Sequence, residues 1–217
     1  MSLLQQAKGH MRAVIRELFE TVILALLIFL ALQFSVRSYR VEGASMQPTL
    51  DHGEYVLVNK LVYLRFDPRG LADLVPLLEV DWGRTVFPFH EPRRGEIVIF
   101  EFPQDRSRDF VKRVVGVPGD TVEIKGGQLV VNGMELAEAY ANLRDKRDRA
   151  PVTVPPDAYY VLGDNRRSSN DSRDWGPVPA ENMVGRAWVS FWPFDRLNGH
   201  WAVPLPWAGM SGHTGTP

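Results

Sequence analysis

The sequence lacks cysteine altogether, with none among its 217 residues. This absence excludes disulfide bonds, thiolate catalysis and cysteine-ligated metals together. It also lacks an excess of charge of either sign, because 25 lysines and arginines are balanced by 26 aspartates and glutamates. That balance gives no electrostatic drive toward nucleic acid, and we expect none as a partner. The length that remains after an anchor predicts one domain, and no internal repeat or low-complexity tract is present.

Charged residues are missing from one long stretch, Thr21 to Val36. The stretch is a little short of the ~20 residues that cross a bilayer, but Leu18 and Phe19 extend it by a turn. A cleaved secretion signal is disfavoured because the exit sequence Gln-Phe-Ser-Val-Arg is poor for cleavage. A buried core helix is disfavoured because Val22 to Leu32 has no polar face. We therefore predict a transmembrane anchor over residues 18–36.

Residues 1–17 form a short, mildly basic segment that we expect on the cytoplasmic side. Arg37 and Arg40 flank the other end of the anchor, so the charge difference favours this orientation only slightly. The domain that follows, residues 37–197, and a C-terminal tail, residues 198–217, are then expected on the opposite side of the membrane.

Beyond the anchor, the pattern is that of a turn-rich β protein. Short runs rich in β-branched and aromatic residues are separated by tight turns, one of them a two-residue glycine turn typical of a hairpin. The predicted strands are Tyr39–Glu42, Tyr55–Lys60, Glu96–Phe102, Phe110–Val117, Thr121–Lys125, Gln128–Val131, Ala158–Leu162 and Gly185–Phe191. This pattern predicts a mostly β domain built as a coiled antiparallel sheet or barrel.

Two segments interrupt the strand pattern. Residues 64–92 carry four prolines and are interpreted as a long loop, with a short helix near Leu71–Leu78. Residues 135–150 are polar and charged, which indicates a small exposed excursion.

Ser45 lies in the segment Gly43-Ala44-Ser45-Met46-Gln47-Pro48-Thr49-Leu50, just beyond the predicted anchor. The small residues Gly43 and Ala44 let a substrate carbonyl come close to Ser45, and Pro48 stiffens the turn that follows. Taken alone, a serine in such a segment is more often a surface turn residue.

Lys112 falls in the predicted strand Phe110–Val117, on the same face as Val114 and Gly116. One interpretation is an edge strand with Lys112 and Arg113 in water. The other is a lysine in a dry site, where burial lowers its pKa from about 10.4 toward neutrality. A neutral amine can take the proton of a serine hydroxyl, and Ser–Lys pairs do so without histidine.

A third polar constellation runs from Gly163 to Gly176, directly after a predicted strand. It can be a solvated loop of Asx and Ser turns. The alternative is a loop that supports an active site, in which Asp171 and Arg173 hold the loop and the Ser169 hydroxyl orients an amine.

In their order along the chain, the segments around Ser45, Tyr55–Lys60, Arg94–Asp120 and Gly163–Arg173 resemble type I signal peptidases of the bacterial kind. The resemblance implies that Ser45 is the nucleophile and Lys112 the general base. The same resemblance implies a largely antiparallel β fold close to the membrane.

Further roles follow from the resemblance. Ser169 is expected to orient Lys112, and Asp171 and Arg173 to brace the site. Supporting and pocket positions complete the expected set, with Arg113, Asp164 and Asn165 supporting the site and Gly43, Ala44 and Met46 forming the substrate pocket.

The implied activity is removal of signal peptides from secreted preproteins, after small residues at the cleavage site and outside the cytoplasm. The expected partners are signal-peptide-bearing preproteins and the lipid bilayer of the cell membrane. The protein is expected to be a single-pass monomer that needs no metal and no other cofactor.

The sequence departs from this family in places. Some members carry a serine two positions before the nucleophile, whose hydroxyl helps to stabilise the oxyanion, whereas this chain has Gly43. The backbone N–H of Ser45 remains as an oxyanion donor, and the Gly43 backbone or a water molecule is expected to contribute. The insertion 64–92 is longer than expected, and the large second β domain of some relatives is expected to be reduced to residues 126–155.

Three other interpretations compete with this one. The self-cleaving domain of SOS-response repressors also uses a Ser–Lys pair, but the anchor and the missing DNA-binding helices argue against it. A Ser-His-Asp hydrolase would need His52 or His90, which are interpreted as exposed loop residues. A catalytically inactive, membrane-tethered module would keep the ability to dock peptides at a sheet edge.

Overall fold

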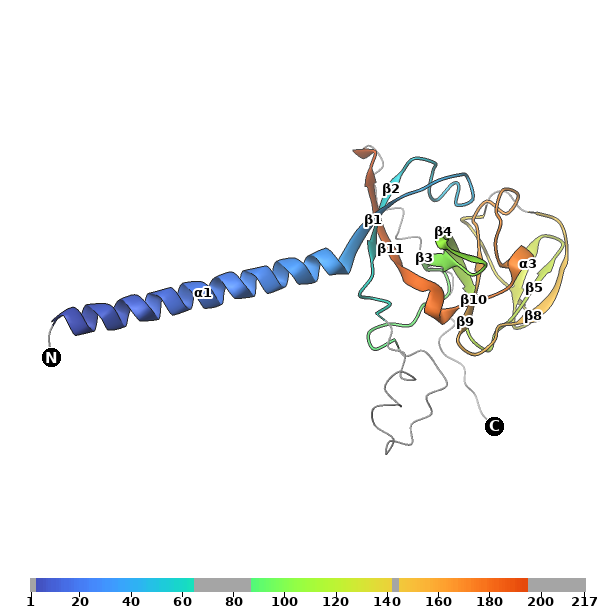
Figure 1. Cartoon of the computed structure of the whole chain (residues 1–217). Helices are drawn as coiled ribbons and strands as arrows, with labels where there is room; N and C mark the ends of the chain where they lie inside the picture. Colours follow the sequence, from blue (N-terminus) through green and yellow to red (C-terminus); the bar gives the residue numbers. More distant parts are fainter. Residues whose placement is uncertain (1–2, 65–86, 142–144, 195–217) are drawn as a thin grey trace, which may run out of the picture.

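The computed structural model describes residues 3–64, 87–141 and 145–194, shown in colour in Figure 1. Most of the predicted insertion 64–92, including the short helix expected near Leu71–Leu78, lies outside the described residues, as does the tail 198–217. The described part consists of a long N-terminal helix and a β body (Figure 1).

Helix α1 spans Leu3–Ser35 and projects away from the β body as a single rod (Figure 1). Its stretch Val14–Ser35 is long and apolar enough to cross a membrane, with a mean hydropathy of 2.2. Only 6% of that stretch is buried within the protein, so packing against the body does not account for its apolar surface. Large side chains such as Phe19 and Phe29 are exposed along it.

The larger sheet is antiparallel throughout, in the order β1-β2-β11-β3-β4-β9-β10. Its strands are β1 Val36–Arg40, β2 Tyr55–Asn59, β3 Ile97–Phe102, β4 Asp105–Gly116, β9 Ala158–Leu162, β10 Val178–Pro179 and β11 Met183–Trp192. The prediction of a mostly β, antiparallel fold after an N-terminal apolar helix is confirmed.

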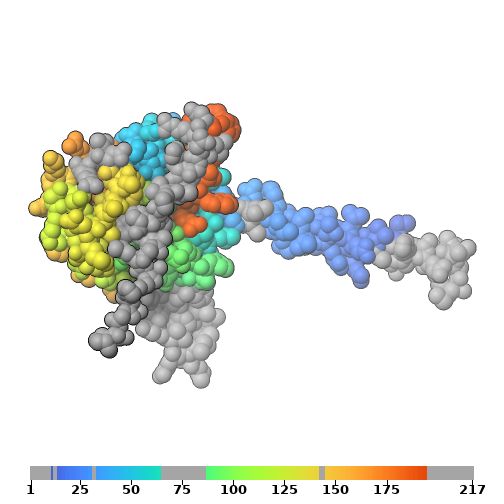
Figure 2. Space-filling view, turned by 180° about the vertical axis from the view of Figure 1, so that it is seen from behind, coloured from blue at the N-terminus to red at the C-terminus, as the bar shows by residue number. Residues whose placement is uncertain are grey.

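A smaller four-stranded sheet has the order β7-β6-β5-β8. Its strands are β5 Thr121–Lys125, β6 Gln128–Val131, β7 Met134–Glu135 and β8 Arg149–Thr153. β5 and β6 form the predicted hairpin, whose turn residues Gly126 and Gly127 both have positive φ. The small sheet lies at the end of the β body away from α1 (Figures 1 and 2).

The interpretation that placed Lys112 and Arg113 of β4 in water is wrong, because both side chains are buried. β3 pairs with β4 on one side, and β9 pairs with it on the other side only from Arg113 to Gly116. Both side chains are buried, with exposed fractions of 4% for Lys112 and 3% for Arg113. The part of β4 that precedes Arg113 therefore has one backbone edge that β9 does not cover.

Several strand boundaries differ from those predicted. β1 begins at Val36 because it continues directly from α1 and pairs with β2 along its whole length. β4 begins at Asp105, since its charged first residues pair with β3 despite their low strand propensity. β7 and β8 lie within or beside the predicted excursion 135–150, at the borders of a polar connection.

One core cluster fixes the Gly43–Leu50 segment to the sheet. Met46 and Leu50 are almost fully buried, and they pack among Val56, Ile97 and Ile99. Burial of each such side chain stabilises the fold by about 1.5–3 kcal/mol. The residues that follow Ser45 in sequence are thus held by packing rather than left as a surface turn.

Candidate active site

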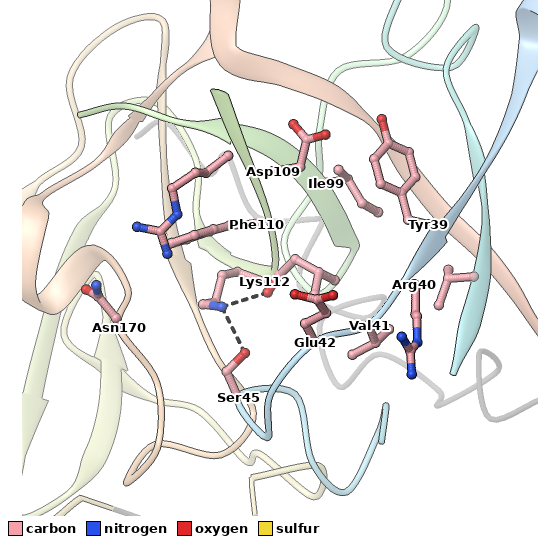
Figure 3. A pocket seen from close by; sticks show the side chains of 13 residues that line it. Tyr39, Arg40, Val41, Glu42, Ser45, Ile99, Asp109, Phe110, Lys112 and Asn170 are labelled. Carbon is pink, nitrogen blue, oxygen red and sulfur yellow. Dashed lines mark hydrogen bonds between the residues drawn. The ribbon is translucent and has the colours of Figure 1, made fainter. Parts of the chain in front are cut away.

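Ser45 lines a cleft, where local backbone hydrogen bonds and the core hold its segment in place (Figure 3). The Gly43–Leu50 segment turns back on itself, with the Gln47 N–H donating to Ala44 O at 3.2 Å. The Asn165 N–H donates to the carbonyl of Ser45 at 3.0 Å, so the loop after β9 supports this serine directly.

Lys112 meets Ser45 inside the cleft, and Figure 3 shows the contact as a dashed line. Its Nζ lies 2.9 Å from Ser45 Oγ and donates to the Val111 carbonyl at 2.8 Å. The ring of Phe110 lies 5.3 Å from the same nitrogen. Two residues separated by 67 positions in the sequence therefore form a hydrogen-bonded Ser–Lys pair.

Burial lowers the pKa of Lys112 from 10.5 to about 8, because the ammonium form loses its solvation. The negative charges of Asp171 and Asp164 act in the opposite direction and raise this pKa, while Arg173 lowers it. At pH 7 about a tenth of the amine is consequently uncharged and able to accept a proton, far more than for a lysine with its ordinary pKa.

A buried ion pair next to Lys112 joins three parts of the chain. Arg113 donates to both carboxylate oxygens of Asp164, at 2.8 and 2.6 Å, and to the Gly95 carbonyl at 2.7 Å. The Thr49 hydroxyl donates to the same carboxylate at 2.5 Å. β4, the loop after β9 and the Gly43–Leu50 segment are tied together at Asp164.

The loop from Gly163 to Arg173, called here the Gly163–Arg173 loop, is fixed by a second carboxylate. Asp171 caps the short helix α3, Ser172–Trp175, by accepting from the Arg173 N–H. Its oxygens also accept from the Arg173 guanidinium at 2.7 and 2.8 Å and from the Gly163 N–H at 3.0 Å. The structure thus brings Asp171 and Arg173 together, in the arrangement expected of residues that hold this loop.

Ser169 lies beside the Ser45–Lys112 pair, but its hydroxyl has no hydrogen-bond partner among the described residues. The contacts of the Lys112 amine go to Ser45 and to the Val111 carbonyl. The expectation that Ser169 orients Lys112 stays a prediction. The Ser169 side chain instead packs against the α-carbon of Gly163.

Gly163→Ala is expected to impair the site. A Cβ at this position would collide with the Ser169 side chain and stand 2.5 Å from the carbonyl oxygen of Ser45. We expect a stability loss of about 1–3 kcal/mol from overpacking. Displacing the serine by about 1 Å is expected to cost about 10²-fold in activity. Thermal melting and steady-state cleavage kinetics measure the two effects.

Gly185→Ala is the matched control for this change. Its Cβ would stand 2.7 Å from the Asn59 carbonyl, between β11 and β2, without touching Ser45 or Lys112. A similar stability loss with nearly full activity is expected there. Equal losses of activity in both variants, measured while both are folded, would contradict a specific role of Gly163.

Gly43 adopts a φ of +87°, a region that side-chain-bearing residues rarely occupy. Its N–H donates to His52 Nδ1 at 3.0 Å, so this backbone donor is already engaged. The suggestion that the Gly43 backbone takes over from a missing oxyanion hydroxyl is therefore not supported by the geometry. The backbone N–H of Ser45 is the donor that remains of those considered from the sequence.

Neither His52 nor His90 forms a triad with Ser45. His52 is exposed and contacts Gly43, whereas His90 is half-buried and hydrogen-bonded to Glu96 at 2.8 Å. Among the described residues, the side-chain partner of the Ser45 hydroxyl is Lys112. Nor does this part of the chain contain a group of three acidic or histidine side chains able to hold a metal ion.

The cleft above Ser45 has a volume of about 510 Å³ and is lined by β1, β4 and the residues that follow β1 (Figure 3). Its apolar lining includes Val41, Val56 and Ile99. Met46, expected as a pocket wall, is fully buried in the core and does not line the cleft. Gly43 and Ala44, also expected in the pocket, precede Ser45 in the chain but do not line the cleft.

Sequence reasoning missed a group of buried polar residues behind the site, namely Glu138, Tyr140 and Arg166. Glu138 and Tyr140 fall within the stretch interpreted as an exposed excursion. No periodicity distinguishes a carboxylate that is buried with a partner from one that is solvated, so the sequence carries no signal for them.

Comparison with known proteins gives consistent matches. A family model described as "Signal peptidase, peptidase S26" matches residues 14–192. A signal peptidase I of Leptolyngbya laminosa is 34% identical over 82% of this chain and 80% of its own. A probable signal peptidase I-2 of Synechocystis sp. is 35% identical over 83% of this chain and 75% of its own. A solved signal peptidase I of Enterococcus faecalis is 33% identical, with a TM-score of 0.42, over 45% of this chain and 97% of its own.

Proposed function

Because this chain belongs to the signal peptidase family, peptidase S26, we propose that it is a membrane-bound serine endopeptidase that removes signal peptides from secreted preproteins. The observation that carries the proposal for the site is the 2.9 Å contact between Ser45 Oγ and Lys112 Nζ in a cleft. Relatives named as signal peptidase I proteins match most of this chain, at similar sequence identities.

In the proposed reaction, the neutral amine of Lys112 takes the proton of the Ser45 hydroxyl as Ser45 Oγ attacks the scissile carbonyl. The C–N bond then breaks, and the lysine ammonium gives its proton to the leaving amine. A water molecule next attacks the acyl-serine ester while Lys112 accepts its proton. As the ester C–O bond breaks, the ammonium of Lys112 returns this proton to Ser45 Oγ, and the new carboxylic acid leaves and loses its remaining proton to solvent.

The substrate is proposed to bind as an extended strand between β1 and the part of β4 that β9 leaves uncovered. Main-chain hydrogen bonds to this edge would hold the peptide in register. The short apolar side chains of Val41 and Val56, together with Ile99, leave room for small substrate residues ahead of the scissile bond. This lining supports the proposed cleavage after small residues.

For the membrane arrangement, the proposal keeps the expected divisions. Residues 1–17 would be cytoplasmic, residues 18–36 would form the anchor in the lipid bilayer, and the catalytic domain, residues 37–197, would be extracytoplasmic. The apolar stretch Val14–Ser35 of α1 and its exposure support the anchor. The orientation rests on the modest charge difference across the anchor. The enzyme is proposed to act as a single-pass monomer.

The test is cleavage of a preprotein by the purified full-length chain in detergent, with the cut site identified by mass spectrometry. One cut after a small residue at the end of the signal peptide is expected, and none with Ser45→Ala. Binding of the preprotein without any cleavage by the wild type would instead favour the peptide-docking module. Cleavage by Ser45→Ala at the wild-type rate would exclude Ser45 as the nucleophile.

A further inference from the structure

A buried carboxylate outside the Ser–Lys pair reaches the same loop from the small sheet. Glu138 follows β7 and is only 4% exposed. Its carboxylate accepts from both terminal nitrogens of Arg166, at 2.8 Å from Nη1 and at a shorter distance from Nη2, and from the Tyr140 hydroxyl at 2.8 Å. Arg166 is also almost fully buried.

Arg166 passes this contact on to the loop beside Ser45. Its Nε donates to the Gly163 carbonyl at 2.9 Å. The Gly163 N–H donates to Asp171, so both backbone polar groups of this glycine are held by charged side chains. Two residues further on, the Asn165 N–H supports the Ser45 carbonyl. The orientation of Gly163 therefore bears directly on the position of Ser45.

Tyr140 provides a second connection from Glu138 to the site. The guanidinium of Arg113 lies 4.0 Å from the centre of the Tyr140 ring, close enough for a cation–π contact. The other side of the Arg113 network reaches Asp164 and Thr49. Glu138 thus holds Arg166 directly, and through the Tyr140 hydroxyl it holds the ring that lies against Arg113.

The charges of this group balance, since Arg113 and Arg166 face Asp164 and Glu138. A buried ion pair contributes little net stability, because desolvation of both charges offsets their attraction. Stability alone gives no reason to bury two such pairs here. Their geometry, with donors aimed at the Gly163 carbonyl and at Asp164, fits a positioning role.

We propose that Glu138 is a positioning residue for the cleavage reaction, which orients Arg166 and Tyr140 and through them holds the Gly163–Arg173 loop against Ser45. The proposal rests on the function proposed above. It gives the small sheet a role in the chemistry, because the chain leaving β7 supplies the carboxylate that supports the loop from behind.

The test compares Glu138→Gln with Asp120→Asn in the full-length enzyme. Asp120 is a matched control, because its buried carboxylate pairs with Arg94 and accepts from Val117 and Asn132 without touching the Gly163–Arg173 loop. Both substitutions turn a buried carboxylate into an amide. With both variants assayed well below their melting temperatures, we expect kcat to fall at least tenfold for Glu138→Gln, KM to change less than twofold, and Asp120→Asn to keep kcat within threefold.

A double variant tests the route of the effect. If Glu138 acts through Arg166, adding Arg166→Gln to Glu138→Gln should lower kcat no further than the more damaging single change does. Losses that multiply would show independent roles and overturn the proposal. An unchanged kcat in folded Glu138→Gln would also overturn it, leaving the pair a purely structural one.

Amide hydrogen exchange provides a readout that does not depend on activity. Glu138→Gln should speed exchange in peptides covering 163–173, and Asp120→Asn should speed it in 117–132 instead. Absence of cleavage by the wild type would contradict the proposed function. Unchanged amide exchange at residues 163–173 in Glu138→Gln would contradict only the role of Glu138. If Glu138→Gln does not fold, Glu138→Asp keeps the charge, withdraws it by one methylene and is judged by the same criteria.

Discussion

Ser45→Ala and Lys112→Met should each lower kcat for preprotein cleavage by at least about 10³-fold while leaving the protein folded. Without the Ser45 hydroxyl, no nucleophile lies 2.9 Å from Lys112 Nζ. Without the amine, the hydroxyl keeps its proton and its attack on a carbonyl is slow. Steady-state kinetics with one preprotein, alongside thermal melting of each variant, measure the effect.

The stability of the lysine variant makes this prediction sharper. Lowering the pKa of Lys112 from 10.5 to about 8 corresponds to about 3 kcal/mol of unfavourable burial of its charged form at neutral pH. Methionine fills a similar volume and carries no charge. Lys112→Met should therefore melt at the same temperature as the wild type or higher. An inactive enzyme that is no less stable cannot owe its inactivity to unfolding.

Lys125→Met is the matched control for the same side-chain change. Lys125 lies at the end of β5 with 66% of its side chain exposed, and it pairs with Glu123. This variant should keep full activity and nearly unchanged stability, since exposed ion pairs contribute about 0–1 kcal/mol.

The two dyad changes should also fail to add. In a residue pair that acts as a unit, Ser45→Ala combined with Lys112→Met is expected to be as inactive as either single variant. If Lys112→Met keeps more than a tenth of wild-type activity, another group acts as the base, and the contacts of His52 and His90 become the next candidates.

The pattern of short apolar runs was sufficient to predict the antiparallel β architecture and the β5–β6 hairpin. These features depend on local propensity and turn chemistry, which a single sequence carries. The pairing of Ser45 with Lys112 came from the resemblance of several segments rather than from spacing, because the two residues meet only through long-range packing.

The burial of Lys112 could not be decided from periodicity. An alternating pattern tells which residues share a face of β4 but not what packs against that face, and here Ser45 lies against Lys112. The burial of Glu138 could not be predicted for a related reason. A glutamate in a polar stretch looks solvated until the fold brings Arg166 against it.

The pH dependence of the reaction should report the same lysine from another direction. Only the neutral amine of Lys112 accepts the serine proton, so kcat/KM should rise about tenfold per pH unit below its pKa of about 8 and level off above it. Asp171 raises this pKa, so Asp171→Asn should move the midpoint of the profile to lower pH. Initial rates from pH 5 to pH 9.5 at low substrate concentration measure both profiles.

Stability should respond to Lys112 in a different pH window, which separates the two effects. Because the folded-state pKa lies below 10.5, the unfolded chain binds more protons between about pH 8 and 10.5, and stability rises with pH there. Below about pH 8 the contribution of Lys112 to stability is constant, whereas kcat/KM still rises with pH there. A rise of kcat/KM centred at about pH 6.5 would indicate a histidine base instead. A rise that follows the melting temperature through the same interval would attribute the profile to folding and remove the case for Lys112 as the base.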